Sequence, residues 1–393
     1  MHAAGPEPSG AARLCLRCKE QNALYEIRSE PACGACFAAF VRVKVAKRFE
    51  VVDRESRSKV GRGTAHYLIG LSLGPSSSAM VNIFDELDER SAKKRRPVSS
   101  SFRVVHVDTS LLDPLSPRPS RWLSHWKATY PRFTFETVPL TDALSLASID
   151  WPSLPSLNSD LPPEARLRDL FGRLPSSTSR ADVTRVFVRH ILMSTAAAHR
   201  CCALLLGNNT TSLAALTLTE TAKGRGFSLP WLTNDGARDV AVSHPGQNQE
   251  EAETISQIVH FPLRELYRKE LVTYAGLVEM DKDKDLGIYG YERSSGSVVS
   301  HKDQSIDDVM ARYFEDIELS FPSVVANVVR TAAKLSSGEP RQPCGLCGAD
   351  IDLHGDQTWK GEMGDEDTTS APSLASAQAG HRLCYGCDRS ING

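Results

Sequence analysis

Residues 67–84 read YLIGLSLGPSSSAMVNIF, and this segment predicts the architecture of the chain around it. Its first half, 67–73, is a short apolar run typical of a buried strand, and a turn with a glycine follows. Its second half has the three hydroxyls of 76–78 and then apolar residues at helical spacing. A strand that enters a helix through such a turn points backbone N–H groups at an anion such as phosphate. The alternative is an ordinary strand-to-helix turn of an α/β protein.

Outside this segment, predicted strands and helices alternate, which indicates a mostly parallel sheet with helices on both faces. We expect further strands at 102–107, 133–140, 201–206 and 255–261, and helices at 77–87, 120–129, 163–174, 180–199, 210–221, 263–277 and 305–334, the last broken at Pro322. Ser179 is the expected N-cap of the helix at 180–199. Because ligands of such folds bind at the carboxyl ends of the strands, the turns at 72–78 and 207–211 and the residue Asp108 should share one rim.

Length and composition fit an ordinary globular protein. The chain has 393 residues, enough for two or three domains, and is 41% apolar and 24% charged. Its formal net charge of −2 provides no overall attraction to nucleic acid or membranes, so a polyanion would need a local patch. No apolar run reaches the length of a membrane span, and the N-terminus has no secretory signal. We therefore expect a cytoplasmic protein with no membrane partner.

The cysteines are the strongest compositional signal. Eight of the ten form four C-x-x-C pairs, and without a secretory signal such pairs favour metal over disulfides. Two C-x-x-C turns can place four thiolates around one tetrahedral zinc ion. We predict two zinc sites, made of Cys15, Cys18, Cys33 and Cys36 and of Cys344, Cys347, Cys384 and Cys387.

The spacing within the two cysteine sets differs. The N-terminal set is C-x2-C-x14-C-x2-C, which is typical of a zinc ribbon, with redox thiols or an iron–sulfur site as alternatives. The C-terminal set has a gap of 36 residues that contains a low-complexity segment, and such loops lengthen at little energetic cost. His354 and His381 flank this set as alternative ligands or as loop residues. The spacing leaves open whether each set closes within its own terminus.

The most basic segment of the chain follows the first cysteine set. An apolar stripe at helical spacing over 37–52 predicts a helix. Its other faces carry Arg42, Lys44, Lys47 and Arg48. We interpret the segment 37–62 as a contact with the phosphates of RNA beside the ribbon, and a solvated helix face is the alternative.

The motifs of this chain resemble those of the PP-loop, or adenine nucleotide alpha hydrolase-like, superfamily. Within it, the chain is similar to the second subunit of the cytoplasmic tRNA 2-thiolation pair. The superfamily sequence S-G-G-x-D-S is here S-L-G-P-S-S at 72–77, and an I-D-E-G-like turn is V-D-T-S at 107–110. The sequence G-H-N-x-D-D is here G-N-N-T-T-S at 207–212. The segments PLRELYRKELVTYAGL at 262–277 and SFPSVVANVV at 320–329 resemble helices of the family.

The chain departs from the motifs of the active members at several rim positions. Leu73 stands in place of the first loop glycine, and Ser76 in place of the loop aspartate. Asn208 replaces a histidine, and hydroxyl residues at 211 and 212 replace an acidic pair. Carboxylates at such a rim would handle magnesium and pyrophosphate, which hydroxyls alone cannot do.

Thiol chemistry is also missing from the expected loops. The only cysteines outside the two sets are Cys201 and Cys202, which lie in a predicted buried strand and are interpreted as core residues. We therefore expect a degenerate nucleotide site without catalytic residues. It comprises Ser72, Gly74, Ser76, Ser77, Asp108, Gly207, Asn208 and Asn209.

The resemblance implies a non-catalytic subunit of a heterodimeric tRNA thiouridylase. Its complex would make 2-thiouridine at the wobble position of the tRNAs for lysine, glutamate and glutamine. The implied partners are tRNA, a catalytic subunit that holds ATP, and a thiocarboxylated ubiquitin-like sulfur carrier. Two rival hypotheses are an active ATP-dependent tRNA sulfurtransferase and a zinc-ribbon adaptor with no role on RNA.

The expected domain organisation follows from these assignments. A parallel-sheet α/β domain of the PP-loop type is flanked by two four-cysteine zinc ribbons. Its parts are a disordered segment 1–12, an N-terminal ribbon 13–36, a basic helix 37–62, a degenerate PP-loop domain 63–335 with insertions at 141–162 and 236–252, and a C-terminal ribbon 340–393 with a low-complexity insertion at 355–380.

Overall fold

The computed structural model describes residues 13–61, 63–93, 100–112, 119–242, 252–280, 304–336, 343–351 and 383–393. The predicted disordered segment 1–12 and the predicted insertion 355–380 lie outside these residues. No helix in the described part of the chain is both long and apolar enough to cross a membrane.

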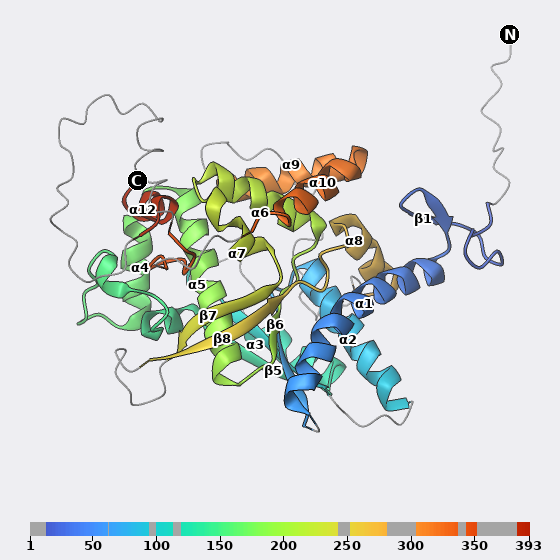
Figure 1. Ribbon diagram of the computed structural model, residues 1–393, viewed down its shortest axis with the longest axis horizontal. Helices are drawn as coiled ribbons and strands as arrows, with labels where there is room; N and C mark the ends of the chain where they lie inside the picture. Colours follow the sequence, from blue (N-terminus) through green and yellow to red (C-terminus); the bar gives the residue numbers. More distant parts are fainter. Residues whose placement is uncertain are drawn as a thin grey trace, which may run out of the picture.

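Six strands form the central sheet in the order β5-β4-β3-β6-β8-β7, near the middle of the view in Figure 1. Their bounds are β3 Ala65–Gly70, β4 Ser100–Asp108, β5 Thr134–Pro139, β6 Ala203–Leu205, β7 Gly236–Val242 and β8 Glu253–His260. The edge strand β7 is antiparallel to β8, and the other neighbouring strands are parallel. A mixed α/β architecture around a mostly parallel sheet confirms the predicted fold class.

Helices cover both faces of this sheet (Figure 1). Their bounds are α1 Gly34–Val60, α2 Pro75–Lys93, α3 Pro119–Thr129, α4 Pro163–Arg173, α5 Ser177–Ala198, α6 Thr210–Ala222, α7 Leu229–Thr233, α8 Arg268–Leu277, α9 Ile306–Ser320, α10 Pro322–Ala332 and α12 Tyr385–Asn392. Three short 3-10 helices are η1 Leu140–Ser145, η2 Trp151–Ser153 and η3 Gly226–Ser228.

Successive side chains of β3 point to opposite faces of the sheet and belong to two separate hydrophobic cores. Tyr67 and Ile69 face a core shared with α1, α2 and α8, whereas Leu68 faces a core shared with α5 and α6. The apolar stripe predicted on the first helix docks it onto the sheet, because the ring of Phe49 packs 5.0 Å from that of Tyr67 and 4.8 Å from that of Phe84. Each cysteine set belongs to one of these cores, so neither ribbon is an isolated module.

Two sequence predictions need correction. Residues 236–242 form the edge strand β7, although 236–252 was expected to be a loop insertion; residues 243–251 lie outside the described part. The sequence of β7 shows no clear alternation of apolar and polar residues, because Val240 and Val242 are its only buried residues. The N-cap of α5 is Ser176, whose hydroxyl accepts a hydrogen bond from the backbone N–H of Ser179, the predicted cap. The insertion 141–162 is irregular, as expected, but buries Ile149 in the core.

Candidate functional site

The first strand-to-helix turn has a left-handed residue at the position where the superfamily motif has its first glycine. Leu73 has a φ of 61°, in the left-handed region that favours glycine. Its side chain is fully buried, which holds the backbone in this conformation. The turn leads directly into α2, which begins at Pro75, a residue well suited to the first position of a helix.

Hydrogen bonds within the turn engage its hydroxyl groups. The Oγ atoms of Ser72 and Ser77 are 3.0 Å apart, and the Ser72 N–H donates to Ser77 Oγ at 3.2 Å. Ser77 Oγ also lies 3.2 Å from the carbonyl oxygen of Gly74, to which it donates. These bonds stabilise the turn, and neutral hydroxyls provide no charge to balance a magnesium ion.

The second turn of the rim packs directly against the first. A Cβ atom added to Gly207 would stand 3.0 Å from the Cα of Ser77, so only glycine allows this approach without displacement. Asn209 caps α6 by accepting a hydrogen bond from the N–H of Ser212 at 2.9 Å. Its amide group donates to Ser76 Oγ at 2.8 Å and so ties the two turns together.

A cavity of about 580 Å³ opens beside these turns. Seven of the eight residues predicted for the degenerate nucleotide site line it, namely Ser72, Gly74, Ser76, Ser77, Gly207, Asn208 and Asn209. Asp108 is not among the lining residues, and its Oδ1 accepts a hydrogen bond from the N–H of Ser110 at 2.9 Å. The structure therefore brings the two predicted turns together and leaves the Asp108 carboxylate bound to its own turn.

Sequence reasoning missed the charged residues of this cavity, which come from α5, α8 and α9. Arg268 pairs with Glu315 at 3.0 Å, and Asp307 accepts a hydrogen bond from Lys223 Nζ at 2.5 Å. Arg185 also lines the cavity. These carboxylates are therefore already neutralised by cations of the chain. No local motif marks them, because they lie on three helices that are far apart in the sequence.

The two remaining cysteines lie away from this rim. Cys201 and Cys202 precede β6, whose carboxyl end leads to Gly207, so they stand at the opposite end of the strand. Burial raises the pKa of the Cys201 thiol to about 11, which keeps it protonated. None of the described residues that line the cavity is a cysteine.

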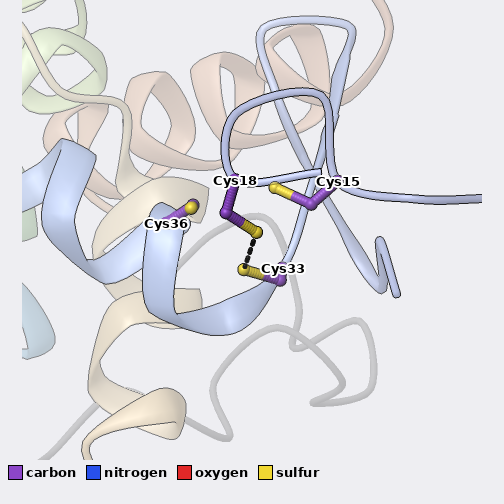
Figure 2. A group of neighbouring side chains, drawn as sticks. All are labelled: Cys15, Cys18, Cys33 and Cys36. Carbon is purple, nitrogen blue, oxygen red and sulfur yellow. Dashed lines mark hydrogen bonds between the residues drawn. The ribbon is translucent and has the colours of Figure 1, made fainter. Parts of the chain in front are cut away.

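The N-terminal cysteines converge on one point (Figure 2). Cys15 and Cys18 lie before the hairpin of β1 Tyr25–Ile27 and β2 Glu30–Ala32, and Cys33 and Cys36 lie at the start of α1. The four sulfurs lie within 4.8 Å of one another, and those of Cys18 and Cys33 are 3.8 Å apart. Backbone hydrogen bonds, above all from Cys18, lower the pKa of Cys15 to about 6 and favour its thiolate.

The C-terminal cysteines form a second, more buried group. Their four sulfurs also lie within 4.8 Å of one another, and those of Cys347 and Cys384 are 3.9 Å apart. Tetrahedral zinc with bonds of about 2.3 Å would place its sulfur ligands about 3.8 Å apart. Thiolates that each bind a separate iron of a cluster must stand further apart, so both groups fit a single ion better. Each group closes within its own terminus, and β1 and α12 lie on opposite sides of the molecule (Figure 1).

A buried cation touches the C-terminal group. Arg225 Nη1 lies 3.5 Å from Cys387 Sγ, and its Nε donates to Glu220 at 2.8 Å. The hydroxyl of Ser390 on α12 donates to the Asp182 carboxylate at 2.7 Å, and Asp182 also accepts a hydrogen bond from Arg225. Four thiolates around a divalent ion keep two negative charges, which a guanidinium in contact with the sulfur offsets.

The predicted basic face of α1 is largely paired within the chain. Arg42 lies 2.7 Å from Glu86 of α2, and Lys44 lies 2.9 Å from Glu265. Arg48 forms an ion pair with Asp235. Lys47 is exposed and has no ion pair among the described residues. Three of these four cations therefore help to hold α1 on the domain.

Comparison with known proteins identifies the family. Residues 305–389 match the model of the family described as Cytoplasmic tRNA 2-thiolation protein 2. A protein of that name from Phaeosphaeria nodorum is 34% identical to this chain over 98% of this chain and 96% of its own length. The chain belongs to the cytoplasmic tRNA 2-thiolation protein 2 family. Another protein of that name, from Sclerotinia sclerotiorum, is 36% identical over 82% of each chain.

The fold of this family member resembles a solved tRNA thiolase. The structure described as the U34-tRNA thiolase NcsA from Methanococcus maripaludis with its 4Fe-4S cluster has a TM-score of 0.54 and 16% identity, and the match covers 88% of this chain and 96% of that chain. These comparisons confirm the family resemblance seen in the sequence and the fold it implies. The names of the relatives describe cytoplasmic proteins, which agrees with the expected location.

Proposed function

We propose that this chain is the non-catalytic subunit of a heterodimeric tRNA thiouridylase. The complex makes 2-thiouridine at the wobble position of the tRNAs for lysine, glutamate and glutamine. A catalytic partner holds ATP and activates the uridine, and a thiocarboxylated ubiquitin-like carrier delivers the sulfur. The family name and the likeness to a tRNA thiolase support the reaction class, and the rim residues support the division of labour.

The observation that carries this proposal is that the two turns at the positions of the superfamily motifs pack together but carry hydroxyls and amides in place of carboxylates. Leu73 retains the left-handed backbone expected of a glycine, and Gly207 retains the close approach of the two turns. At the same time, Ser76 carries no charge, and its Oγ accepts a hydrogen bond from the Asn209 side chain. A scaffold that keeps its geometry while losing carboxylates and thiols fits a supporting subunit better than an enzyme.

The two cysteine groups support the same role. Zinc fits both groups by donor type and sulfur spacing, and the residues that would hold it are the two sets of four cysteines. When bound, such an ion supplies structural cross-linking rather than reaction chemistry, because four thiolates leave no open coordination position. The N-terminal ion would fix the turn before the hairpin to the start of α1, and the C-terminal ion would fix the turn at 343–351 to the start of α12.

Deletion and complementation test the proposed function. Cells without this chain should lack wobble 2-thiouridine, measured by mass spectrometry of tRNA nucleosides, and the wild-type chain should restore it. The purified chain alone should release no pyrophosphate from ATP and tRNA, whereas the complex with its catalytic partner should. Turnover by the isolated chain would favour the rival of an active sulfurtransferase, and normal thiolation without the chain would favour an adaptor with no RNA role.

A second candidate is nucleotide binding without turnover. The cavity of about 580 Å³ favours it, together with His106, whose Nδ1 bonds to the Leu71 carbonyl while its buried Nε2 has no partner among the described atoms. Calorimetric titration with ATP and AMP tests this candidate. Binding by the wild type that is lost in Gly207→Val, where the added side chain presses on Ser77, would support it, and heats equal to those of buffer would exclude it.

A further inference from the structure

A second groove, larger than the degenerate nucleotide cavity, lies at the junction of the N-terminal hairpin with the helical part of the chain. Its volume is about 980 Å³. Its lining comes from the turn between β1 and β2, from α1, from the segment that leads into α8, from α8 itself, and from the junction of α9 with α10. The groove is thus built from segments that are remote in the sequence.

Cations outnumber carboxylates among the residues that line this groove. The cations are Arg28, Arg48, Arg264, Lys269 and Arg330, and the carboxylates are Glu26, Glu265 and Glu270. Two of these carboxylates have fixed partners. Glu270 accepts a hydrogen bond from the Tyr267 N–H at 2.8 Å and lies 3.5 Å from Arg28, and Glu265 pairs with Lys44.

Three of the lining cations bond only to neutral oxygens. Lys269 Nζ donates to the carbonyl of Glu318 at 3.0 Å, and Arg330 donates to the side-chain oxygen of Asn327. Arg264 donates to a backbone carbonyl and to the side-chain oxygen of Asn234 at 3.1 Å. No carboxylate of the described residues lies within ion-pair distance of these three cations. Neutral acceptors orient a cation and leave its charge available to an anion.

Arg28 is held in place at the rim of the groove. Its guanidinium lies 5.7 Å from the ring centre of Phe40 and 5.5 Å from that of Tyr267. Its side chain remains 46% exposed. A preoriented arginine loses less conformational entropy when it binds a phosphate than a free one does.

We propose that this groove binds the sugar-phosphate backbone of tRNA through cations outside the basic face of α1, because Arg48, the residue of that face that lines the groove, is paired with Asp235. The inference rests on the proposed function, because it assumes that the chain meets tRNA. It relocates the contact from Arg42, Lys44 and Arg48, whose charges are compensated within the chain, to Arg264, Lys269 and Arg330, with Arg28 at the rim. Sequence-independent binding of this kind depends on counterion release and is weakened by salt.

Charge reversal of two groove cations tests this assignment. The probe is an unmodified tRNA transcript for lysine, titrated with the full chain in complex with its catalytic partner at several salt concentrations. Lys269→Glu with Arg330→Glu should raise Kd roughly tenfold or more and reduce the salt slope by about two, one for each phosphate contact. The conservative pair Lys269→Arg with Arg330→Lys should bind as the wild type does.

Two exposed arginines at another site provide a matched control. Arg168→Glu with Arg180→Glu changes the net charge equally, on α4 and α5, which lie apart from α8 in Figure 1. Thermal unfolding of each variant checks that it folds. An equal loss of tRNA affinity in the control, or wild-type affinity and slope in the groove variant, would overturn the proposal. Normal tRNA binding with lost thiolation would also overturn it and point to an acidic protein as the occupant.

The outcomes separate this inference from the proposed function. If deletion of the chain abolishes 2-thiouridine while the groove variant binds tRNA and supports thiolation normally, the groove assignment is wrong and the proposed function stands. If deletion leaves 2-thiouridine unchanged, the proposed function is wrong and the groove loses its basis.

Discussion

Arg225 Nη1 contacts Cys387 Sγ at 3.5 Å and thereby joins the C-terminal cysteine group to a buried ion network. The same guanidinium pairs with Asp182 and Glu220, which are both 1% exposed. Although burial raises the pKa of Asp182, the charges of Arg225 and Lys223 hold it below its ordinary value. The network also includes Arg185 and Asp307, which line the rim cavity, so one set of charges spans the metal group and the cavity.

Removal of the Arg225 charge should destabilise the protein strongly. Arg225→Leu leaves the buried carboxylates of Asp182 and Glu220 with fewer cations, which costs about 3–5 kcal/mol of unfolding free energy. It should also speed the release of metal from the C-terminal group, measured with a chelating dye. In the control, Arg17→Ala breaks an exposed ion pair with Glu30 and should cost less than about 1 kcal/mol. Equal urea midpoints for the two variants would contradict this account.

The two metal groups should respond differently to a chelator. Cys18 and Cys36 are only half-buried, whereas all four C-terminal cysteines are buried. We therefore expect two zinc ions per chain by elemental analysis, with the N-terminal ion removed first. Loss of the second ion should coincide with loss of helical circular dichroism, because Cys384 and Cys387 share a core with Phe187 of α5. Simultaneous release of both ions without unfolding would contradict this expectation.

Replacing Leu73 by glycine should not restore enzyme activity. Glycine removes the strain of a left-handed residue with a side chain, which stabilises the fold by about 1–2 kcal/mol. It also removes a fully buried side chain, which destabilises the fold by about 2–5 kcal/mol. The expected net result is a modest loss of unfolding free energy. The matched variant Leu205→Gly, in a fully buried strand position, should lose more. Pyrophosphate release should stay at background in Leu73→Gly, because the rim still lacks an aspartate at 76. Turnover in this single variant would refute the degenerate assignment.

Asp235 should contribute stability that disappears in acid. Although burial raises its pKa, a hydrogen bond and charge from His260, together with the charge of Arg48, lower the pKa to about 2 from an ordinary value of 3.8. A folded-state pKa below the unfolded value gives stability that is complete above pH 4 and is lost as the pH falls towards 2. The contribution is about 2 kcal/mol.

The measurement is the difference in unfolding free energy between the wild type and Asp235→Asn as a function of pH. This difference should be larger at pH 5 than at pH 3, because Asp235 becomes protonated as the pH falls. Metal loss in acid affects both proteins alike. A difference that stays constant from neutral to strongly acid pH would show that the Asp235 charge does not stabilise the fold.

Some features of this protein follow from residues that are close together in the chain. The run at 67–84 predicts a strand, a turn and a helix, because hydrophobic periodicity and turn chemistry act over a few residues. The C-x-x-C pairs likewise predict two four-cysteine groups, because a short turn directs two thiolates at one point. The glycine at 207 marks a close approach, although the sequence does not reveal that Ser77 is the neighbour.

Other features depend on through-space partners that no local pattern encodes. Lys44 is 221 positions from Glu265, and Arg48 is 187 positions from Asp235, so a basic helix in the sequence becomes a compensated interface in the fold. The charged wall of the rim cavity and the cationic groove also assemble from remote helices. A residue's type sets its charge, but the field it presents depends on which opposite charges the packed chain places beside it.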